Sequence, residues 1–435
     1  MNAPCLHLGV GIDTARYAHH VSFLDSQKRT AAKPFHFLES QQGYRKLEDA
    51  LRKLKHKHPQ AHFHIRIDAA GQYAENLLHY LHQLDFPATI SVGQPARNKA
   101  YRKVHFDKRK ADPAESAVCA RFAVVEQPQA TPYNPPAFAQ LRDAVALAEA
   151  AAKQQTRLVN QLHNMLARVF PEFAVHVSNL DANWALCLLE AYPIPEKLAR
   201  AQDKSLAKIP HLKTKVAQTL KAAAQTTTGS SGGEIAELLV RQKVREIRLQ
   251  QKHAESLETL METAWNQLPQ GPHQRLRSIP GIGLLTASAL VAKIVTIERF
   301  PTAKALIGYF GVFPEEVDVS GTDRQGNPKT ARLQRMSCKG NDLVRRLLYC
   351  ASQTAVLWNP PVRALFARLQ ASGKENYSLC VGHCMAKLLR QVFALWKKDE
   401  DFDPSWEGEL PADKPLSEVE NSAAGHKEEL TSSQG

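Results

Sequence analysis

The chain has 435 residues, of which 43% are hydrophobic, 23% are charged and seven are irregularly spaced cysteines. This composition excludes a disulfide scaffold and is ordinary for a globular protein of two or three domains. No apolar run approaches the roughly 20 residues of a membrane span, and the N-terminus lacks a signal-peptide pattern, so we expect a cytoplasmic protein with no membrane partner. The formal net charge of +13 predicts a polyanionic partner, most simply nucleic acid; a well-solvated basic surface is the alternative.

The first part of the chain alternates strand and helix patterns. Apolar residues alternate within LHLGVGIDTARYAHHVSFLD at 6–25, which predicts two strands of a hairpin. An amphipathic helix at 43–59, a strand at 62–68, a helix at 74–86, a third apolar run at 88–93 and a helix at 112–126 follow in that order. This order predicts a mixed α/β sheet with helices against it. A proline-rich break at 128–138 marks the boundary of a first domain, 1–137.

The middle of the chain, 138–272, is predicted to be helical. Apolar residues recur at alternating steps of four and three over 141–169 and again over 240–268, which is typical of coiled-coil seams. The stretch TTTGSSGG at 226–233 predicts a flexible linker between them. We favour a dimer element; an ordinary helical hairpin within one chain is the alternative.

A third, all-α domain is predicted over 273–399. In SIPGIGLL, Gly281 and Gly283 predict a tight turn before a helix, a helix–hairpin–helix-like arrangement whose free amides suit phosphate; a plain inter-helix turn is the alternative. Helices are expected at 302–310, 341–358 and 377–397, and an acidic, disordered tail at 400–435. Cys380 and Cys384 in CVGHC suggest an apolar helix face rather than a metal site, because no second ligand pair follows.

Four acids occupy comparable places in the first domain. Asp13 and Asp68 end predicted strands, while Asp112 and Glu115 lie three residues apart at a helix start and hence on one face. Converging carboxylates repel unless a cation neutralises them, and oxygen ligands suit Mg²⁺, which in pairs activates phosphodiesters. A basic loop just before Asp112 would hold a nucleic-acid backbone through Arg102, Lys103, Lys108, Arg109 and Lys110.

Six stretches of the sequence together resemble one protein family. GIDTARYAHHVSFLD, IDAAGQYAENLLHYL and KADPAESAVCARF resemble the RuvC/RNase H-like domain of the DEDD insertion-sequence transposases, relatives of the Piv DNA invertases. SIPGIGLLTASALVAKI, RFPTAKALIGYFGVFPEEVDVSG and SCKGNDLVRRLLYCAS resemble that family's second, transposase domain. The resemblance extends in the expected order over nearly all of residues 5–400.

The resemblance implies how such a protein acts. Members recombine donor and target DNA with Mg²⁺ held by RuvC-domain acids, and a serine attacks the DNA phosphate to form a phosphoserine intermediate. A structured non-coding RNA guides them, and they assemble as dimers and then tetramers, associated with the nucleoid when acting. The matching acids are Asp13, Asp68, Asp112 and Glu115, and the matching serine is Ser320 in DVSGTDRQG.

Two acids depart from the family pattern. The second acid is usually Glu and here is Asp68, whereas the fourth is usually Asp and here is Glu115. The longer Glu115 offsets the shorter Asp68, or Glu75 supplies the missing reach; we favour Asp68. A degenerate, inactive copy is the other possibility, against which the intact C-terminal motifs argue.

Ser320 needs activation, because a serine hydroxyl is a weak nucleophile. No histidine is adjacent in sequence, so a carboxylate-bound metal is the expected activator. Arg324, Arg332, Arg335 and Lys339 lie near it in sequence and would hold phosphate oxygens; solvated loop charges are the alternative.

We therefore expect an RNA-guided, Mg²⁺-dependent DNA recombinase. One alternative is a RuvC-like metal-dependent nuclease that uses water in place of Ser320. Another is a site-specific invertase that needs no RNA. A third is a non-catalytic nucleic-acid-binding remnant.

Overall fold

The computed structural model of the protein describes residues 6–68, 71–93, 95–105, 112–317, 333–337, 339–372 and 376–404. Its contacts divide the chain into two compact units, Met1–Ala139 and Gln140–Gly435. The finer division into three domains and a tail stays a prediction. Among the described helices, none is both long enough and apolar enough to cross a membrane.

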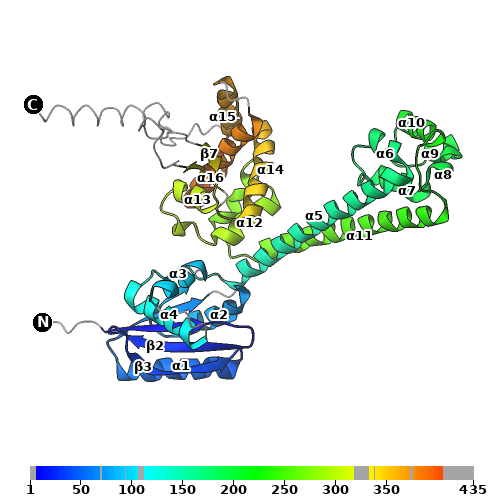
Figure 1. Ribbon diagram of the computed structural model, residues 1–435. Helices are drawn as coiled ribbons and strands as arrows, with labels where there is room; N and C mark the ends of the chain where they lie inside the picture. The colour runs from blue at the N-terminus through cyan, green and yellow to red at the C-terminus, as the bar shows by residue number, and fades with distance from the viewer. Residues whose placement is uncertain are drawn as a thin grey trace, which may run out of the picture. The chain divides into compact units, whose positions relative to one another are not determined.

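The first unit is built on one five-stranded sheet (Figure 1). Its strands are β1 (His7–Asp13), β2 (Ala18–Asp25), β3 (Thr30–Leu38), β4 (His62–Asp68) and β5 (Ala88–Gly93), in the spatial order β3-β2-β1-β4-β5. β1, β2 and β3 pair antiparallel, and β4 and β5 extend the sheet in parallel from β1. The mixed α/β prediction is confirmed. The sequence reasoning missed β3, an edge strand that contains Pro34, because proline is tolerated in sheets mainly at edges.

Helices cover both faces of this sheet. α1 (Gln41–Lys57) and α2 (Glu75–Gln83) bury their apolar faces in the same core as Val10, Ile12 and Phe63. Side chains alternate between the faces of a strand, so Gly9 and Gly11 of β1 face the opposite way. That second face is covered by α4 (Asp112–Glu126), and a short helix, α3 (Pro95–His105), packs beside α4.

Two glycines let α4 approach β1 closely. A Cβ atom at Gly11 would lie 2.0 Å from the Ser116 carbonyl oxygen and 2.1 Å from the Ala120 nitrogen. At Gly9 it would lie 2.2 Å from the Ala120 carbonyl oxygen. Because real Cβ atoms do not come so near, any larger residue here displaces α4.

The second unit contains two 34-residue helices, α5 (Pro136–Val169, which begins in the first unit) and α11 (Gly233–Asn266), drawn side by side in Figure 1. They pair within the chain: Lys243 Nζ donates to Gln161 Oε1 at 2.9 Å, and Gln250 Nε2 to the Ala151 carbonyl oxygen at 3.1 Å. The predicted seams are buried at residues such as Leu162 and Val244. The predicted seam positions Ala152 and Ala254 are exposed, since a straight helix drifts away from a strict heptad repeat. The dimer element stays a prediction.

Small helices pack against the C-terminal part of α5 and the N-terminal part of α11, and they share one apolar core with both. They are α6 (Pro171–His176), α7 (Asn183–Ala191), α8 (Pro195–Ala199), α9 (Asp203–Leu206) and α10 (Thr214–Gln225). The loop at 226–232, expected as a flexible linker, is hydrogen-bonded to α6: the Thr227 and Thr228 hydroxyls donate to Glu172 at 2.7 and 3.0 Å. Burial acts to raise the pKa of the Glu172 carboxyl. The two hydroxyl bonds and a third bond from the Thr228 N–H outweigh burial and lower this pKa to about 2.

The rest of the second unit is mostly helical. Its elements are η2 (Pro272–Ser278), α12 (Leu284–Ile294), η3 (Ile297–Arg299), α13 (Ala303–Tyr309), β6 (Pro314–Val317), β7 (Leu333–Met336), α14 (Asp342–Trp358), α15 (Pro360–Ala371) and α16 (Tyr377–Lys398). Three predicted helices are confirmed as α13, α14 and α16. Cys380 and Cys384 are fully buried on α16, as an apolar face requires. The missed helix α15 starts where the Asn359 side chain caps it and Pro360 opens its first turn.

Candidate metal centre

Three of the predicted acids meet at the carboxyl ends of the two neighbouring inner strands β1 and β4. Asp13 ends β1, Asp68 ends the neighbouring parallel strand β4, and Glu115 lies in the first turn of α4. One carboxylate oxygen of each lies within 4.8 Å of those of the other two. The carboxyl ends of parallel neighbouring strands lie side by side. Because α4 packs against Gly9 and Gly11 of β1, its first turn lies next to these strand ends. All three side chains are partly buried.

Asp68 is held by a chain of hydrogen bonds that the sequence reasoning missed. Asn98 Nδ2 donates to Asp68 Oδ1 at 2.8 Å, while Asn98 Oδ1 accepts from Arg66 Nη2 at 2.8 Å. Thr14 Oγ1 donates to the Asp68 carbonyl oxygen at 2.8 Å. The Arg66 guanidinium lies 3.8 Å from the centre of the Phe122 ring on α4. This series of hydrogen bonds fixes the orientation of the Asp68 carboxylate. The sequence held one signal for it that was not used: Arg66 lies two residues before Asp68 and hence on the same face of β4.

Glu115 forms an ion pair with Arg102 of α3. The two side chains are 21% and 27% exposed, for Arg102 and Glu115 respectively. The sequence reasoning placed Arg102 in a basic loop, which is wrong, because residues 95–105 form a helix. Arg102 therefore compensates part of the negative charge of the acid cluster.

A buried polar network lies beside the acids. His20 Nδ1 and Ser22 Oγ on β2 lie 2.6 and 2.7 Å from Ser116 Oγ, next to Glu115 on α4. His20 is the strand partner of Asp13. The sequence offered a signal for this network, since His20 and Ser22 put polar side chains on one face of an otherwise apolar strand.

The electrostatic environment of the three acids favours a cation. Burial first, and then the negative charge of Asp68, raise the pKa of the Cys119 thiol on α4 far above its usual value. Three carboxylates so close together repel one another in a partly buried site. Their donor set consists only of oxygen, which suits a hard divalent cation better than a thiophilic one. The residues present therefore fit a divalent metal ion.

The remaining predicted acids are placed less completely. Asp112 is the first residue of α4, and its side chain lies outside the described part of the structure. Glu75 begins α2 and is not a member of the three-carboxylate group, which favours Asp68 over it.

Among the predicted nucleic-acid-binding residues, Lys103 is exposed on α3. Lys108, Arg109, Lys110, Ser320, Arg324, Arg332 and the side chain of Arg335 lie outside the described residues.

The predicted glycine turn before α12 has a packing role. Gly281 has φ of +101°, and a Cβ there would lie 2.5 Å from the Ala351 carbonyl oxygen on α14. Gly283 is the N-cap of α12, and a Cβ there would meet nothing within 4 Å. The tight turn is confirmed, and the phosphate-binding role of its amides stays a prediction.

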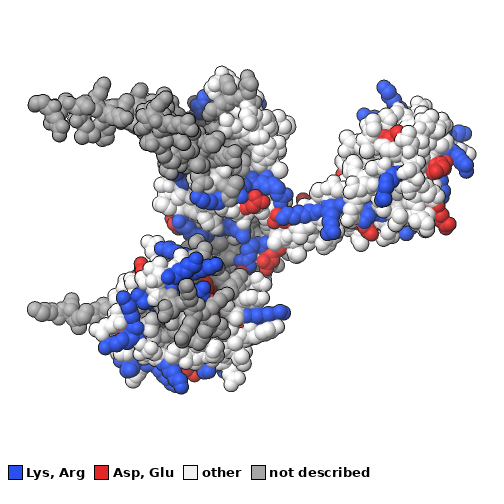
Figure 2. Space-filling view, in the orientation of Figure 1, with Lys and Arg blue, Asp and Glu red and all other residues white. Residues whose placement is uncertain are grey.

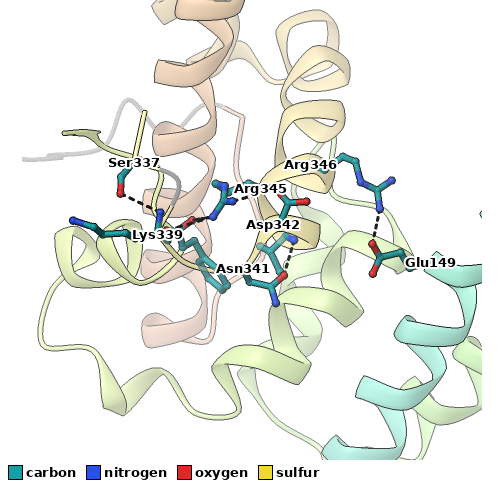
Figure 3. A network of polar contacts seen from close by, with 9 residues as sticks. Glu149, Ser337, Lys339, Asn341, Asp342, Arg345 and Arg346 are labelled. Carbon is teal, nitrogen blue, oxygen red and sulfur yellow. Dashed lines mark hydrogen bonds and ion pairs between the residues drawn. The ribbon is translucent and has the colours of Figure 1, made fainter. Parts of the chain in front are cut away.

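Lys339 lies in a polar network before α14 (Figure 3). Its N–H donates to Ser337 Oγ at 3.3 Å, and its carbonyl oxygen accepts from Arg345 Nη1 at 3.3 Å. The next residue, Arg346, pairs with Glu149 of α5 at 3.1 Å. These hydrogen bonds hold the loop before α14, and the Lys339 residue is exposed; its predicted role in binding phosphate stays a prediction.

Comparison with known proteins identifies the class of protein to which this mixed α/β unit, with its carboxylate cluster, and the mostly helical unit after it belong: the transposases. Residues 10–171 match the family model of DEDD transposases of the IS110 type, and residues 273–367 match the transposase model of the IS116/IS110/IS902 family. Together the two matches cover more than half of the chain. The chain belongs to the DEDD-type insertion-sequence transposases.

Two curated relatives are similar over part of their length. The "Insertion element IS110 uncharacterized 43.6 kDa protein" of Streptomyces coelicolor is 25% identical over 245 residues, which is 55% of this chain and 58% of that protein. The "Putative transposase y4uE" of Sinorhizobium fredii is 32% identical over 74 residues, 17% of this chain and 21% of that protein. The chain thus spans less than two thirds of either relative.

Proposed function

We propose that the protein is a DNA transposase that cuts and rejoins the ends of an insertion sequence. The observation that carries the proposal is the meeting of Asp13, Asp68 and Glu115 within 4.8 Å in a chain of this family. The strand order β3-β2-β1-β4-β5 and the acids at its edge support a RuvC-like fold for the first unit.

In this proposal the three acids, with Asp112 as a fourth, hold Mg²⁺. An ion held by these carboxylates would neutralise their charge and would supply the polarisation of a phosphodiester that attack requires. Asn98 keeps the Asp68 carboxylate turned towards the site, and Arg102 holds Glu115 until the metal and DNA arrive. The shorter Asp68 and longer Glu115 still reach one another, which supports an active copy rather than a degenerate one.

Ser320 is the proposed nucleophile, and its support is the resemblance of DVSGTDRQG to the family motif. Its Oγ gives up its proton and forms a bond to the phosphorus, while the P–O bond to one DNA strand breaks; the released 3′- or 5′-oxygen takes up a proton and leaves as a hydroxyl. Attack by a hydroxyl of the exchanging strand then reverses the step and frees Ser320. The antiparallel strands β6 and β7 pair Val317 with Leu333, the described residues that flank the stretch containing Ser320.

The remaining parts of the proposal concern partners. Lys and Arg are more widespread than Asp and Glu on the face drawn in Figure 2, and the net charge is +13, which supports DNA and a guide RNA as polyanionic partners. Donor and target selection by a structured RNA, and assembly into dimers and tetramers, rest on the family resemblance.

A covalent-adduct assay tests the proposal. The protein is incubated with Mg²⁺, element-end DNA and RNA transcribed from the flanking non-coding region, and the products are separated on a denaturing gel. We expect a protein-linked DNA band that disappears in Ser320→Ala and Asp68→Asn but persists in the controls Ser372→Ala and Asp143→Asn, both at exposed positions.

Each other outcome identifies a different function. Free nicked DNA from both the wild type and Ser320→Ala would identify a nuclease that uses water. Adducts without RNA would identify an RNA-independent recombinase. Binding without cleavage under any metal would leave only a nucleic-acid-binding protein.

A further inference from the structure

Three histidines cluster at the end of the sheet remote from the acids. His7 is the first residue of β1, and His62 and His64 are the first and third residues of β4. Their ring centres lie 4.6 Å (His62–His64), 5.3 Å (His7–His64) and 6.0 Å (His7–His62) apart. The strand register pairs His7 with His62, which places both on the α4 side of the sheet. Six residue steps along β1, roughly 20 Å, separate His7 from Asp13.

Hydrogen bonds leave part of this cluster unsatisfied. His7 Nδ1 and His64 Nε2 lie 3.0 Å apart, so a single proton is shared between them. His64 is only 6% exposed, and its Nδ1 is buried without a hydrogen-bond partner. The nitrogen of His64 that faces His7 is Nε2, and it is this nitrogen that a ligand shared with His7 would use.

The chemistry of the cluster suits a transition metal. Neutral imidazole nitrogens are common protein ligands of transition metals. Two nitrogens bound to one tetrahedral Zn²⁺ at 2.0–2.1 Å lie roughly 3.3 Å apart, close to the 3.0 Å between His7 Nδ1 and His64 Nε2.

We propose that His7, His62 and His64 bind one Zn²⁺-like divalent ion, in a site separate from the carboxylate centre. His62 is exposed, and its Nε2 lies 2.9 Å from Thr89 Oγ1 of β5. As placed, the three rings do not bring one nitrogen each within 4.8 Å of one another. The proposal therefore requires the His62 ring to turn away from Thr89, which gives up one exposed hydrogen bond. The ion would replace the shared proton and tie the starts of β1 and β4 together.

The two centres differ in the ions they select. Imidazole nitrogens favour Zn²⁺, Ni²⁺ and Cu²⁺, whereas carboxylates favour Mg²⁺ and Mn²⁺. The histidine site is therefore expected to bind Zn²⁺ in the presence of excess Mg²⁺. Its role is structural, since it lies at the opposite end of the strands from the acids.

Calorimetric titration of the untagged, full-length, chelator-treated protein with Zn²⁺ in excess Mg²⁺ tests the proposal. We expect one Zn²⁺ per chain and a higher melting temperature with Zn²⁺ than without it. Removing one ligand with His62→Ala is expected to weaken Zn²⁺ binding at least about tenfold. The control His56→Ala changes an exposed histidine of α1, and Asp68→Asn changes the acid centre; both should bind Zn²⁺ as the wild type does.

Cobalt gives a second readout that does not depend on stability. Co²⁺ bound by the histidines should produce a visible absorption band that is lost in His62→Ala and His7→Ala. If His64→Ala does not fold, these two variants still decide the question, because neither replaces a fully buried side chain. The proposal is overturned if Zn²⁺ binding is absent, unchanged in the histidine variants, or abolished by Asp68→Asn.

Discussion

The close contact between β1 and α4 yields a prediction for Gly11→Ala. The added Cβ would lie 2.0 Å from the Ser116 carbonyl oxygen and 2.1 Å from the Ala120 nitrogen. Ordinary contacts begin near 3.5 Å, so α4 has to withdraw by about 1.5 Å. Both obstructing atoms belong to the helix backbone, which means that no side-chain rotation can relieve the clash.

The displacement has two measurable effects. Overpacking of this kind lowers the free energy of unfolding by about 1–3 kcal/mol, or more. The same movement carries Glu115 away from Asp13 and Asp68, and Mg²⁺ tolerates little error in its ligand distances of about 2.0–2.1 Å. We therefore expect Gly11→Ala to weaken binding of Mg²⁺ or Mn²⁺ by at least about tenfold.

Urea denaturation and calorimetric metal titration of the purified variant measure these effects. The matched control is Gly308→Ala in α13, where a Cβ meets nothing within 4 Å, so that stability should be unchanged or higher. If Gly11→Ala retains wild-type stability and metal affinity, α4 does not lie on β1 as described, and the account of the acid cluster fails with it.

Three further predictions concern other parts of the chain. Asn98→Ala removes the bond to Asp68 and should lower the free energy of unfolding by about 2–3 kcal/mol in urea denaturation; an unchanged value would contradict the proposed orienting role. Burial lowers the pKa of His273, so the folded state resists protonation and stability should fall as the pH drops below about 6.5. In His273→Phe this component of the pH dependence should vanish when unfolding is followed between pH 5 and 8. Gly281→Ala should lower thermal stability by about 1–3 kcal/mol, because of its positive φ and its close approach to α14, whereas Gly283→Ala should cost less than about 1 kcal/mol; equal effects would contradict the packing role.

Much of the fold was predictable because its elements carry strong periodic patterns. The helical repeat in α14 and α16 follows from burial of a single face. β1 and β4 are buried on both faces, but they alternate because large apolar side chains line one face while glycine or polar residues line the face towards α4. The exceptions are positions where context overrides pattern. β3 tolerates Pro34 because it is an edge strand, and α15 begins at a pair of prolines, which the first turn of a helix tolerates but its interior does not.

The candidate site was predictable in its acids but not in their supports. Asp13 and Asp68 follow apolar strands, so their position at a sheet edge could be deduced. Asn98 and Arg102 lie on α3, whose approach to the sheet depends on tertiary packing and leaves no local pattern. The spatial pairing of Arg102 with Glu115 likewise required the three-dimensional fold.

The central place of β1 in its sheet has a consequence for folding during synthesis. β1 pairs with β2 in a short hairpin as soon as both strands are synthesised. Its other edge has no partner until β4 is synthesised, and its glycine face is not covered until α4 is synthesised. Closing these longer loops costs chain entropy before any packing is gained. A nascent chain halted before residue 112 therefore exposes an unfinished sheet, and a metal ion can stabilise the unit only after α4 has left the ribosome and docked.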